Sequence, residues 1–282
     1  MFIGENTLGL FGIYPDMNVL SLFDGMSGAQ IALERAKIPV SNYYASEIDK
    51  FSIKIAQKNY PETIQLGDIS NIDVNSLPKI DLLIGGSPCQ GFSFAGKRLN
   101  FDDPRSKLFF LYAKILKEVK PKYFILENVS MKKESRDIIS KNLGVEPLEI
   151  NSNLLSAQNR KRLYWTNIPL ETPEDRNIYL KDIIQTGFVD RNKSYAIDAS
   201  YFKGGSLEYL IDIYTNKYKR QIVFEELYPE NITWRMLTPI ECERLQTVPD
   251  NYTEGVSNTQ RYKMLGNSFT VDVIAHILKG IM

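Results

Sequence analysis

The stretch NVLSLFDGMSG (18–28) decides the fold of this 282-residue chain. Residues 18–23 form a short apolar run that is typical of a buried parallel strand, and the turn after it leads into a helical repeat at 29–37. A strand, a turn and a helix in this order are the first half of a βαβ unit. Glycine in such a turn lets the backbone approach a ligand closely. The stretch therefore predicts an α/β sheet with a ligand-binding turn at its edge.

The same alternation of apolar runs and helical repeats continues to residue 170. It predicts further strands at 42–48, 81–86, 123–128, 145–150 and 162–167, and helices at 51–60 and 108–119. Alternation of this kind indicates an α/β fold, a doubly wound and mostly parallel sheet with helices on both faces.

Two helical segments follow residues 171–232, where the alternation is lost. The segment 238–246 begins with a capping box, in which Thr238 is the N-cap and Glu241 stands three residues later. The C-terminal stretch 268–281 has an apolar stripe at helical spacing, so we expect it to dock on the core. The stripe consists of Val271, Ile274, Leu278 and Ile281.

Composition and charge limit the classes of protein to which this chain can belong. The 34 Lys and Arg balance the 34 Asp and Glu, and a zero net charge usually argues against a nucleic-acid partner. Residues 97–170, however, hold 15 basic and 8 acidic side chains. No apolar run approaches the roughly 20 residues of a membrane span, and no basic residue precedes the first apolar patches as in a secretory signal. A cytoplasmic protein without membrane contact is expected.

Cysteine and histidine are scarce. Cys89 and Cys242 lie 153 positions apart, which excludes a four-thiolate zinc site and a disulfide scaffold. The single histidine, His276, excludes most Ser-His-Asp and Cys-His chemistry. We expect no metal, and we expect carboxylates to carry out proton transfer. Cys242 and His276 are assigned to structural roles.

A nucleophile and a proton donor follow two of the predicted strands, at the edge where α/β sheets bind ligands. GSPCQGFS (86–93) places Cys89 after strand 81–86. Free cysteines are usually buried and inert, but proline and small flanking residues favour an exposed turn here. Glu127 ends the apolar strand 123–128, and burial should disfavour its ionised form. The two residues can combine nucleophilic and acid catalysis without histidine.

Other polar groups converge on the same edge. Glu47 stands about 20 residues after the first turn, where nucleotide-binding folds place an acid on ribose hydroxyls, and Asp68 follows a possible further strand. No G-x-G-x-x-G or G-K-[ST] pattern exists, which disfavours NAD and ATP. Arg160 and Arg162 alternate on an extended segment and should project to one side into the site. There they would lower the pKa of the thiol or clamp a phosphate or a pyrimidine carbonyl, whereas the alternative is a solvated basic turn.

Together these motifs resemble the cytosine-C5 methyltransferase family. The resemblance covers residues 18–282 apart from a variable stretch near 171–232. The Phe-Asp-Gly form of the first motif is similar to the eukaryotic de novo enzymes, and Gln-Gly-Phe-Ser after Cys89 is the bacterial form. A compact bacterial or phage enzyme with a de novo-like core describes the chain best. The matching elements are Phe23-Asp24-Gly25-x-x-Gly28, Glu47, Asp68, Gly86-Ser87-Pro88-Cys89-Gln90, Glu127-Asn128-Val129, Gln158-x-Arg160-x-Arg162, Arg235-x-Leu237-Thr238-Pro239-x-Glu241 and Gly266-Asn267-Ser268.

The resemblance implies a Rossmann-like catalytic domain at 1–170 plus 262–282 and a smaller target-recognition domain at 171–261. The cofactor would be S-adenosylmethionine, with S-adenosylhomocysteine as the product and no metal. Glu47 would bind its ribose and Asp68 would lie near the adenine amine. The implied cofactor residues are Phe23, Asp24, Gly25, Met26, Ser27, Gly28, Glu47, Ile48, Asp68, Ile69, Pro88, Leu108, Asn267 and Ser268.

The resemblance also implies the reaction and its substrate. Cys89 would add to C6 of a cytosine flipped out of duplex DNA, because a stacked base cannot present C6 to a thiolate. Glu127 would contact N3 and the exocyclic amine, Arg162 would orient the base through O2, and Arg160 would support the catalytic loop. The expected DNA contacts combine the loop after Cys89 with basic residues of the recognition region. They are Gln90, Ser93, Arg191, Lys193, Lys203, Lys217, Lys219 and Arg220.

Two alternatives stay open on the sequence alone. The tRNA-directed branch of the family typically has a Pro-Pro-Cys motif and a Cys-Phe-Thr element, whereas this chain has Ser-Pro-Cys and no cysteine in 171–232. A non-catalytic DNA-binding homologue typically lacks the cysteine or the acid, and Cys89, Glu127 and Arg162 are all present. We expect a monomer that acts on DNA in a bacterial cell or a phage-infected host, and a cognate restriction endonuclease is a candidate partner.

Overall fold

The computed structural model describes residues 16–88, 107–204, 220–228 and 231–281. Within them, the core is a seven-stranded sheet with the order β3-β2-β1-β4-β5-β8-β6. Neighbours from β3 to β5 are parallel, and β8 runs antiparallel to both β5 and β6. The predicted mostly parallel α/β sheet is confirmed. Its strands are β1 (Met17–Leu22), β2 (Val40–Ser46), β3 (Ile64–Gln65), β4 (Leu82–Gly85), β5 (Tyr123–Val129), β6 (Leu148–Asn151) and β8 (Lys161–Thr166).

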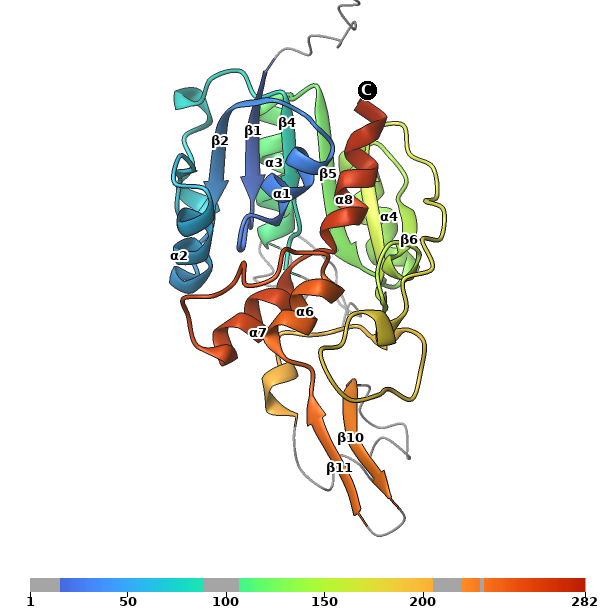
Figure 1. Cartoon of the computed structure of the whole chain (residues 1–282). Helices are drawn as coiled ribbons and strands as arrows, with labels where there is room; N and C mark the ends of the chain where they lie inside the picture. Colours follow the sequence, from blue (N-terminus) through green and yellow to red (C-terminus); the bar gives the residue numbers. More distant parts are fainter. Residues whose placement is uncertain (1–15, 89–106, 205–219, 229–230, 282) are drawn as a thin grey trace, which may run out of the picture.

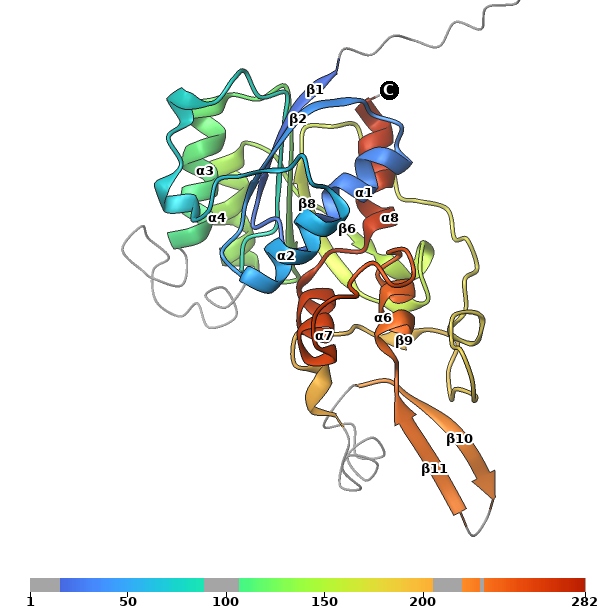
Figure 2. The same ribbon diagram turned by 60° about the vertical axis from the view of Figure 1, so that its left-hand side comes forward.

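Helices cover both faces of the sheet (Figures 1 and 2). One face carries α1 (Gly28–Arg35) and α8 (Val271–Leu278), and the other carries α3 (Lys107–Val119) and α4 (Lys133–Leu143). β1 alternates between the two cores, because Val19 packs with α1 and α8 while Leu20 and Leu22 pack with α3 and α4. All three side chains are fully buried, which explains why the first stretch is apolar on both sides.

The C-terminal helix docks as predicted. Val271, Ile274 and Leu278 of α8 are fully buried against the core that α1 also contacts. The helix α6 (Pro239–Leu245) has the predicted capping box, since the Thr238 hydroxyl accepts from the Glu241 N–H and the Glu241 carboxylate accepts from the Thr238 N–H at 2.7 Å. The docking of α8 therefore brings the C-terminal end of the chain back to the core that contains Val19 of β1.

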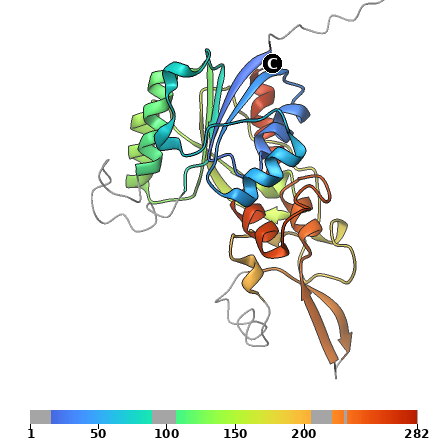
Figure 3. The same cartoon turned by 90° about the vertical axis from the view of Figure 1, so that its left-hand side faces the viewer.

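The stretch predicted to be the recognition region contains short elements and one long hairpin, and this hairpin was not predicted. Strands β10 (Ile222–Tyr228) and β11 (Asn231–Met236) pair antiparallel and project away from the sheet (Figure 3). The predicted domain boundary at 261/262 falls inside α7 (Asn258–Asn267), and the division into domains stays a prediction. The remaining elements are α2 (Lys50–Asn59), β7 (Gln158–Asn159), β9 (Ser194–Tyr195), η1 (Ile69–Asn71), η2 (Val74–Ser76), η3 (Ser152–Leu154), η4 (Leu180–Asp182), η5 (Tyr201–Lys203) and η6 (Lys279–Ile281).

Two features are absent from the described residues. No helix among them is long and apolar enough to cross a membrane. They also contain no group of three or more His, Cys, Asp or Glu side chains that could hold a metal ion.

Candidate active site

A cavity of about 580 Å³ lies at the carboxyl ends of the central strands. Its walls come from the turn after β1, the segment between β2 and α2, the loop after β4 and the end of β5. Residues 197–199 of the recognition region and 266–269 near the chain end complete it. The cavity lies where open α/β sheets bind their ligands.

The turn after β1 forms one wall of this cavity. Glu47 shapes it, because one carboxylate oxygen accepts from the Gly25 N–H at 2.8 Å while the other accepts from the N–H groups of Ile48 and Asp49 at 2.7 and 2.8 Å. Gly25 has a φ of +61°, a conformation that favours glycine. The acid that follows β2 therefore orders the turn as well as facing the cavity.

The predicted turn residues form two groups in the structure. Phe23, Asp24 and Gly25 line the cavity, whereas Met26, Ser27 and Gly28 are buried and do not line it. The chain turns here into α1, which begins at Gly28 with Ser27 as its N-cap, and Met26 packs into the core on that face. Gly28 serves a different close approach, since a Cβ there would lie 3.2 Å from the Phe269 ring and 3.3 Å from the Ser268 hydroxyl.

Asp24 is a buried carboxyl beneath the turn. Its oxygens accept from the hydroxyls of Tyr43, at 2.6 Å, and Ser27. Burial, reinforced by the nearby Glu47 carboxylate, raises the pKa of Asp24 to about 6 against these hydrogen bonds. At neutral pH the folded chain therefore carries a negative charge on the buried Asp24 carboxyl.

This raised pKa predicts a pH-dependent stability difference. Well below its ordinary pKa of 3.8, Asp24 is protonated in both the folded and the unfolded chain, and as the pH rises from about 4 to above 6 up to about 3 kcal/mol of stability is lost. Asp24→Asn, which carries no charge, should be more stable than the parent chain at pH 7.5 and equal to it near pH 3. Urea unfolding of both proteins at the two pH values measures this. An advantage that does not change with pH would contradict it.

The other predicted cofactor residues also line the cavity. Ile48 is 73% exposed there, and Asp68 caps η1 by accepting from the Ser70 N–H and hydroxyl at 2.8 and 2.7 Å. These hydrogen bonds hold the pKa of Asp68 below its usual value. The remaining lining residues of the predicted set are Glu47, Ile69, Pro88, Leu108, Asn267 and Ser268.

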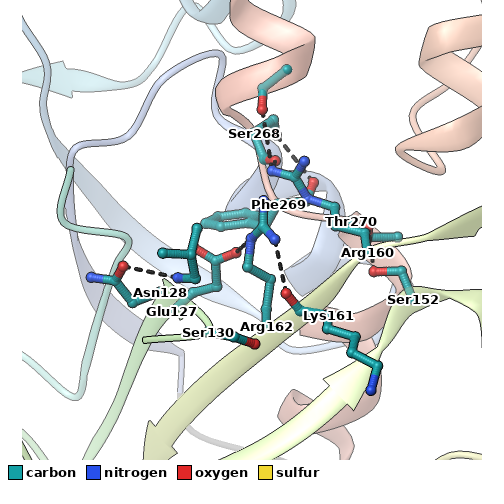
Figure 4. A network of polar contacts seen from close by, with 12 residues as sticks. Glu127, Asn128, Ser130, Ser152, Arg160, Lys161, Arg162, Ser268, Phe269 and Thr270 are labelled. Carbon is teal, nitrogen blue, oxygen red and sulfur yellow. Dashed lines mark hydrogen bonds and ion pairs between the residues drawn. The ribbon is translucent and has the colours of Figure 1, made fainter. Parts of the chain in front are cut away.

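An ion pair lies at the β5 side of the cavity. Arg162 Nε is 3.1 Å from Glu127 Oε1, and the two side chains are only 16% and 13% exposed (Figure 4). The pair forms because β8 lies beside β5 in the sheet. Gly86 leaves room for the acid, since a Cβ there would lie 3.2 Å from Glu127 Oε2. Burial of Glu127 was expected from the sequence, and the structure also places the positive charge of Arg162 against it.

Arg160 and Arg162 both line the cavity, and Lys161 between them pairs with Glu149 instead, as the predicted alternation requires. Arg160 is almost fully buried and donates to the carbonyls of Ile197 at 2.9 Å, Gly266 at 3.2 Å and Ser268 at 2.7 Å. Burial, with the Arg162 charge, lowers the pKa of Arg160 to about 10. Arg160 thus connects Ile197 to Gly266 and Ser268 near the chain end, and Figure 4 shows its side chain beside Ser268.

Some cavity residues were not predicted. Asn128 donates from Nδ2 to the carbonyl and hydroxyl of Ser87 at 3.2 and 3.1 Å, which fixes the backbone two positions before Cys89. The only sequence signal for this was its place in the Glu-Asn-Val motif. Asp49 and Lys263 form a 2.8 Å ion pair at the cavity wall. Cys89 itself, with Gln90 and Ser93, lies outside the described residues.

The two described lysines among the predicted DNA contacts differ in whether their side chains are available to DNA. Lys193 does not fit the expectation, because its ammonium donates to the carbonyls of Asn153, Ser156 and Ile178 at 2.6, 3.2 and 2.7 Å and its side chain is 14% exposed. All three ammonium donors are then used inside the protein. Lys203 is exposed.

The two predicted arginines are partly engaged. Arg191 pairs with Asp190 and lies 4.0 Å from the Tyr195 ring centre. Arg220 donates to the Ser200 hydroxyl at 2.8 Å. Lys217 and Lys219 lie outside the described residues.

Cys242 and His276 were predicted to have structural roles. Cys242 is fully buried in α6, and burial raises the pKa of its thiol. His276 lies off the apolar stripe of α8 with a ring nitrogen 2.8 Å from the Glu171 carbonyl. Neither residue lines the candidate active site.

The sheet with its cavity is the fold of S-adenosylmethionine-dependent methyltransferases. The structure is similar to that of the Entamoeba histolytica methyltransferase EhMeth, with a TM-score of 0.76 and 19% identity over 95% of this chain and 98% of that one. It is also similar to a putative DNA modification methyltransferase encoded within an E. coli prophage, with a TM-score of 0.66 and 21% identity over 94% and 98% of the two chains.

Sequence comparison identifies the family. The family model described as C-5 cytosine-specific DNA methylase matches residues 17–174 and 132–282. The Type II methyltransferase M1.ScrFI of Lactococcus lactis subsp. cremoris is 33% identical over 94% of this chain and 77% of its own length. M.NlaX of Neisseria lactamica is 31% identical over 92% and 94%. The chain belongs to the C-5 cytosine-specific DNA methylases and is a DNA cytosine-C5 methyltransferase, which confirms the resemblance.

Proposed function

We propose that the chain transfers a methyl group from S-adenosylmethionine to C5 of a cytosine that is flipped out of duplex DNA. One observation carries this proposal. A single cavity joins the turn at 23–25 and the acids Glu47 and Asp68 to the Glu127–Arg162 pair. Cofactor-binding groups and base-binding groups therefore face the same space.

The donor groups of the cavity fit the cofactor. Acids after β2 and β3 suit its ribose hydroxyls and adenine amine, and the exposed Ile48 offers an apolar surface to the purine ring. Glu47 already accepts three N–H groups, two on Oε1 and one on Oε2, so Oε2 keeps a free lone pair for a ribose hydroxyl. The bound cofactor would supply a methyl group on a positively charged sulfur. Met26, Ser27 and Gly28 would support the turn from beneath.

The base would bind at the Glu127 end. Cys89 follows Pro88, which lines the cavity, and Asn128 holds the backbone at Ser87. The Cys89 thiolate would add to C6 of the ring while the Glu127 carboxyl donates its proton to N3, which stabilises the electron pair that moves into the ring. C5 would then be nucleophilic and would take the methyl group as its bond to the cofactor sulfur breaks, with S-adenosylhomocysteine as the leaving group. Loss of the C5 proton to solvent would expel the thiolate, and return of the N3 proton to Glu127 would restore the aromatic ring.

DNA would contact the recognition region and the loop after Cys89. Among the described residues, Lys203, Arg191 and Arg220 keep their proposed roles, and Lys193 is withdrawn because its donors are used internally. Gln90, Ser93, Lys217 and Lys219 stay predicted contacts. The monomeric state, the cytoplasmic location and a restriction endonuclease partner also stay predictions.

A direct assay tests the substrate. Purified protein with methyl-labelled S-adenosylmethionine should label duplex DNA and leave tRNA unlabelled. Bisulfite sequencing of the product should then place 5-methylcytosine at one sequence context. Labelling of tRNA alone would favour the RNA-directed alternative, and labelling of neither would favour the non-catalytic one.

Glu127→Gln tests the role of the acid. The amide cannot supply the proton or the charge that the ring requires, so methyl transfer should fall by about 10²- to 10⁴-fold. Binding of S-adenosylhomocysteine should change little, because Glu127 lies at the base end of the cavity. Isothermal titration and a single-turnover assay measure the two effects.

Glu149→Gln is a matched control on the same sheet. Glu149 also pairs with a cation of β8, Lys161, at 3.3 Å, but both side chains are well exposed and lie outside the cavity. This variant should retain the activity of the parent chain. Equal losses in the two variants would show that the ion pair supports only the sheet.

A further inference from the structure

A second cavity, of about 480 Å³, is lined by residues of α1, α6 and α8 and of the segments next to them, and it shares no lining residue with the candidate active site. Four cations from separate parts of the chain line it: Arg35 at the end of α1, Arg176 after β8, Arg244 in α6 and Lys279 after α8. The carboxylate among its described lining residues is Asp272. The lining of this cavity therefore carries a net positive charge although the chain as a whole is neutral.

Asp272 holds two of these cations in place. Arg35 Nη1 lies 2.6 Å from Oδ1 and Arg176 Nη1 lies 2.5 Å from Oδ2, and the Asp272 side chain is only 14% exposed. Its own N–H donates to the Thr247 hydroxyl at 2.8 Å. Each guanidinium has five N–H donors, so one contact to Asp272 leaves most of them for a ligand.

The third arginine is held by a separate set of contacts. Arg244 pairs with Asp250 through Nε and Nη2 at 2.9 and 2.6 Å, and Nη1 donates to the Ile183 carbonyl at 2.9 Å. Thr247, which anchors Asp272, has a φ of +54°. This is a strained conformation for a β-branched residue, and surrounding contacts must compensate for it. The three arginines are thus held in place before any ligand arrives.

We propose that this second cavity binds a phosphate-bearing anion. Guanidinium groups match phosphate oxygens in pairs, and groups that are already ordered lose little entropy on binding. The volume falls in the range of pockets that take nucleotide-sized ligands, so a chain of phosphates fits better than one. That chain comes either from a free polyphosphate or from the backbone of the DNA substrate.

The double variant Arg176→Gln/Lys279→Gln tests the proposal. It removes two cations while Arg35 keeps Asp272 paired, and Lys279 is exposed, so the fold should survive. With inorganic tripolyphosphate at constant ionic strength, thermal unfolding should report an affinity about tenfold or more below that of the parent chain. Lys114→Gln, on the opposite face and 61% exposed, is the control and should match the parent chain.

A long duplex without a cytosine target separates the two sources. If DNA supplies the phosphates, the double variant should lower the slope of log affinity against log salt by roughly two, because two phosphate contacts are lost. If the double variant binds tripolyphosphate more weakly but has the same salt slope on DNA as the parent chain, the natural ligand is a free polyphosphate. If neither probe distinguishes the double variant from Lys114→Gln, the proposal is overturned. Should the double variant not fold, Lys279→Gln alone should give a smaller shift in the same direction, and no shift would overturn the proposal equally.

Discussion

Cys89→Ala is expected to lower methyl transfer to duplex DNA by at least roughly a thousandfold, because no other nucleophile is proposed to activate the cytosine ring. Pro88, just before it, lines the cavity that also holds Glu127 and Arg162. The cofactor end of the cavity is untouched, so the variant should bind S-adenosylhomocysteine as the parent chain does. A filter-binding assay with labelled cofactor measures the transfer, and calorimetry measures the binding.

A trapping experiment gives this prediction a second readout. Duplex DNA with 5-fluorocytosine at the target should form a covalent adduct with the parent chain, because fluorine cannot leave C5 as a proton does. Cys89→Ala should form none. Cys242→Ala is the control, since Cys242 is fully buried in α6 and should leave trapping intact. An adduct in Cys89→Ala would assign the attack to another residue.

Gly266→Ala is expected to cost about 3 kcal/mol or more of stability. A Cβ at Gly266 would lie 2.1 Å from the Asp198 carbonyl carbon and 2.3 Å from the Ala199 nitrogen. This backbone cannot move away freely, because Arg160 binds the carbonyls of both Ile197 and Gly266. Either the segment 197–199 or the cavity wall at Ser268 must then shift.

Such a shift should weaken the reaction as well as the fold. A displacement of about 1 Å at the reacting groups can lower the rate roughly a hundredfold, so methyl transfer should fall by this order even where the variant is still folded. Gly204→Ala is the matched control, since its φ is −71° and its Cβ would have only ordinary contacts from 3.4 Å. Urea unfolding and cofactor titration of both variants provide the test, and two equally stable variants would refute the steric argument.

Much of the sheet could be predicted because its strands are buried on both faces. β1 spans 17–22 against a predicted 18–23, and β4 spans 82–85 against 81–86. The helix α4 (Lys133–Leu143) was missed because it is mostly charged and polar and buries few apolar side chains. The hairpin β10–β11 was missed because it is defined by the pairing between its two strands. Its first strand contains Glu225 and Glu226 and so does not form a continuous apolar run.

The candidate site was predictable to the extent that its chemistry is local. Glu47, Asp68, Glu127 and Arg162 stand at strand ends or on adjacent strands, and the structure brings them to one cavity. The internal use of Lys193 was not predictable, because two of its acceptors, the carbonyls of Asn153 and Ile178, are 40 and 15 positions away.

The sequence by itself determined the sheet, the family and the ordered motifs, because apolar runs and reactive residues at strand ends act through local spacing. Only the tertiary structure decided which motif residues face the cavity. It buried Met26 and Gly28 beneath the turn and used Arg160 to join Ile197 to Ser268. Such assignments depend on partners brought together by packing, and no local pattern encodes which distant carbonyl will lie opposite a given cation.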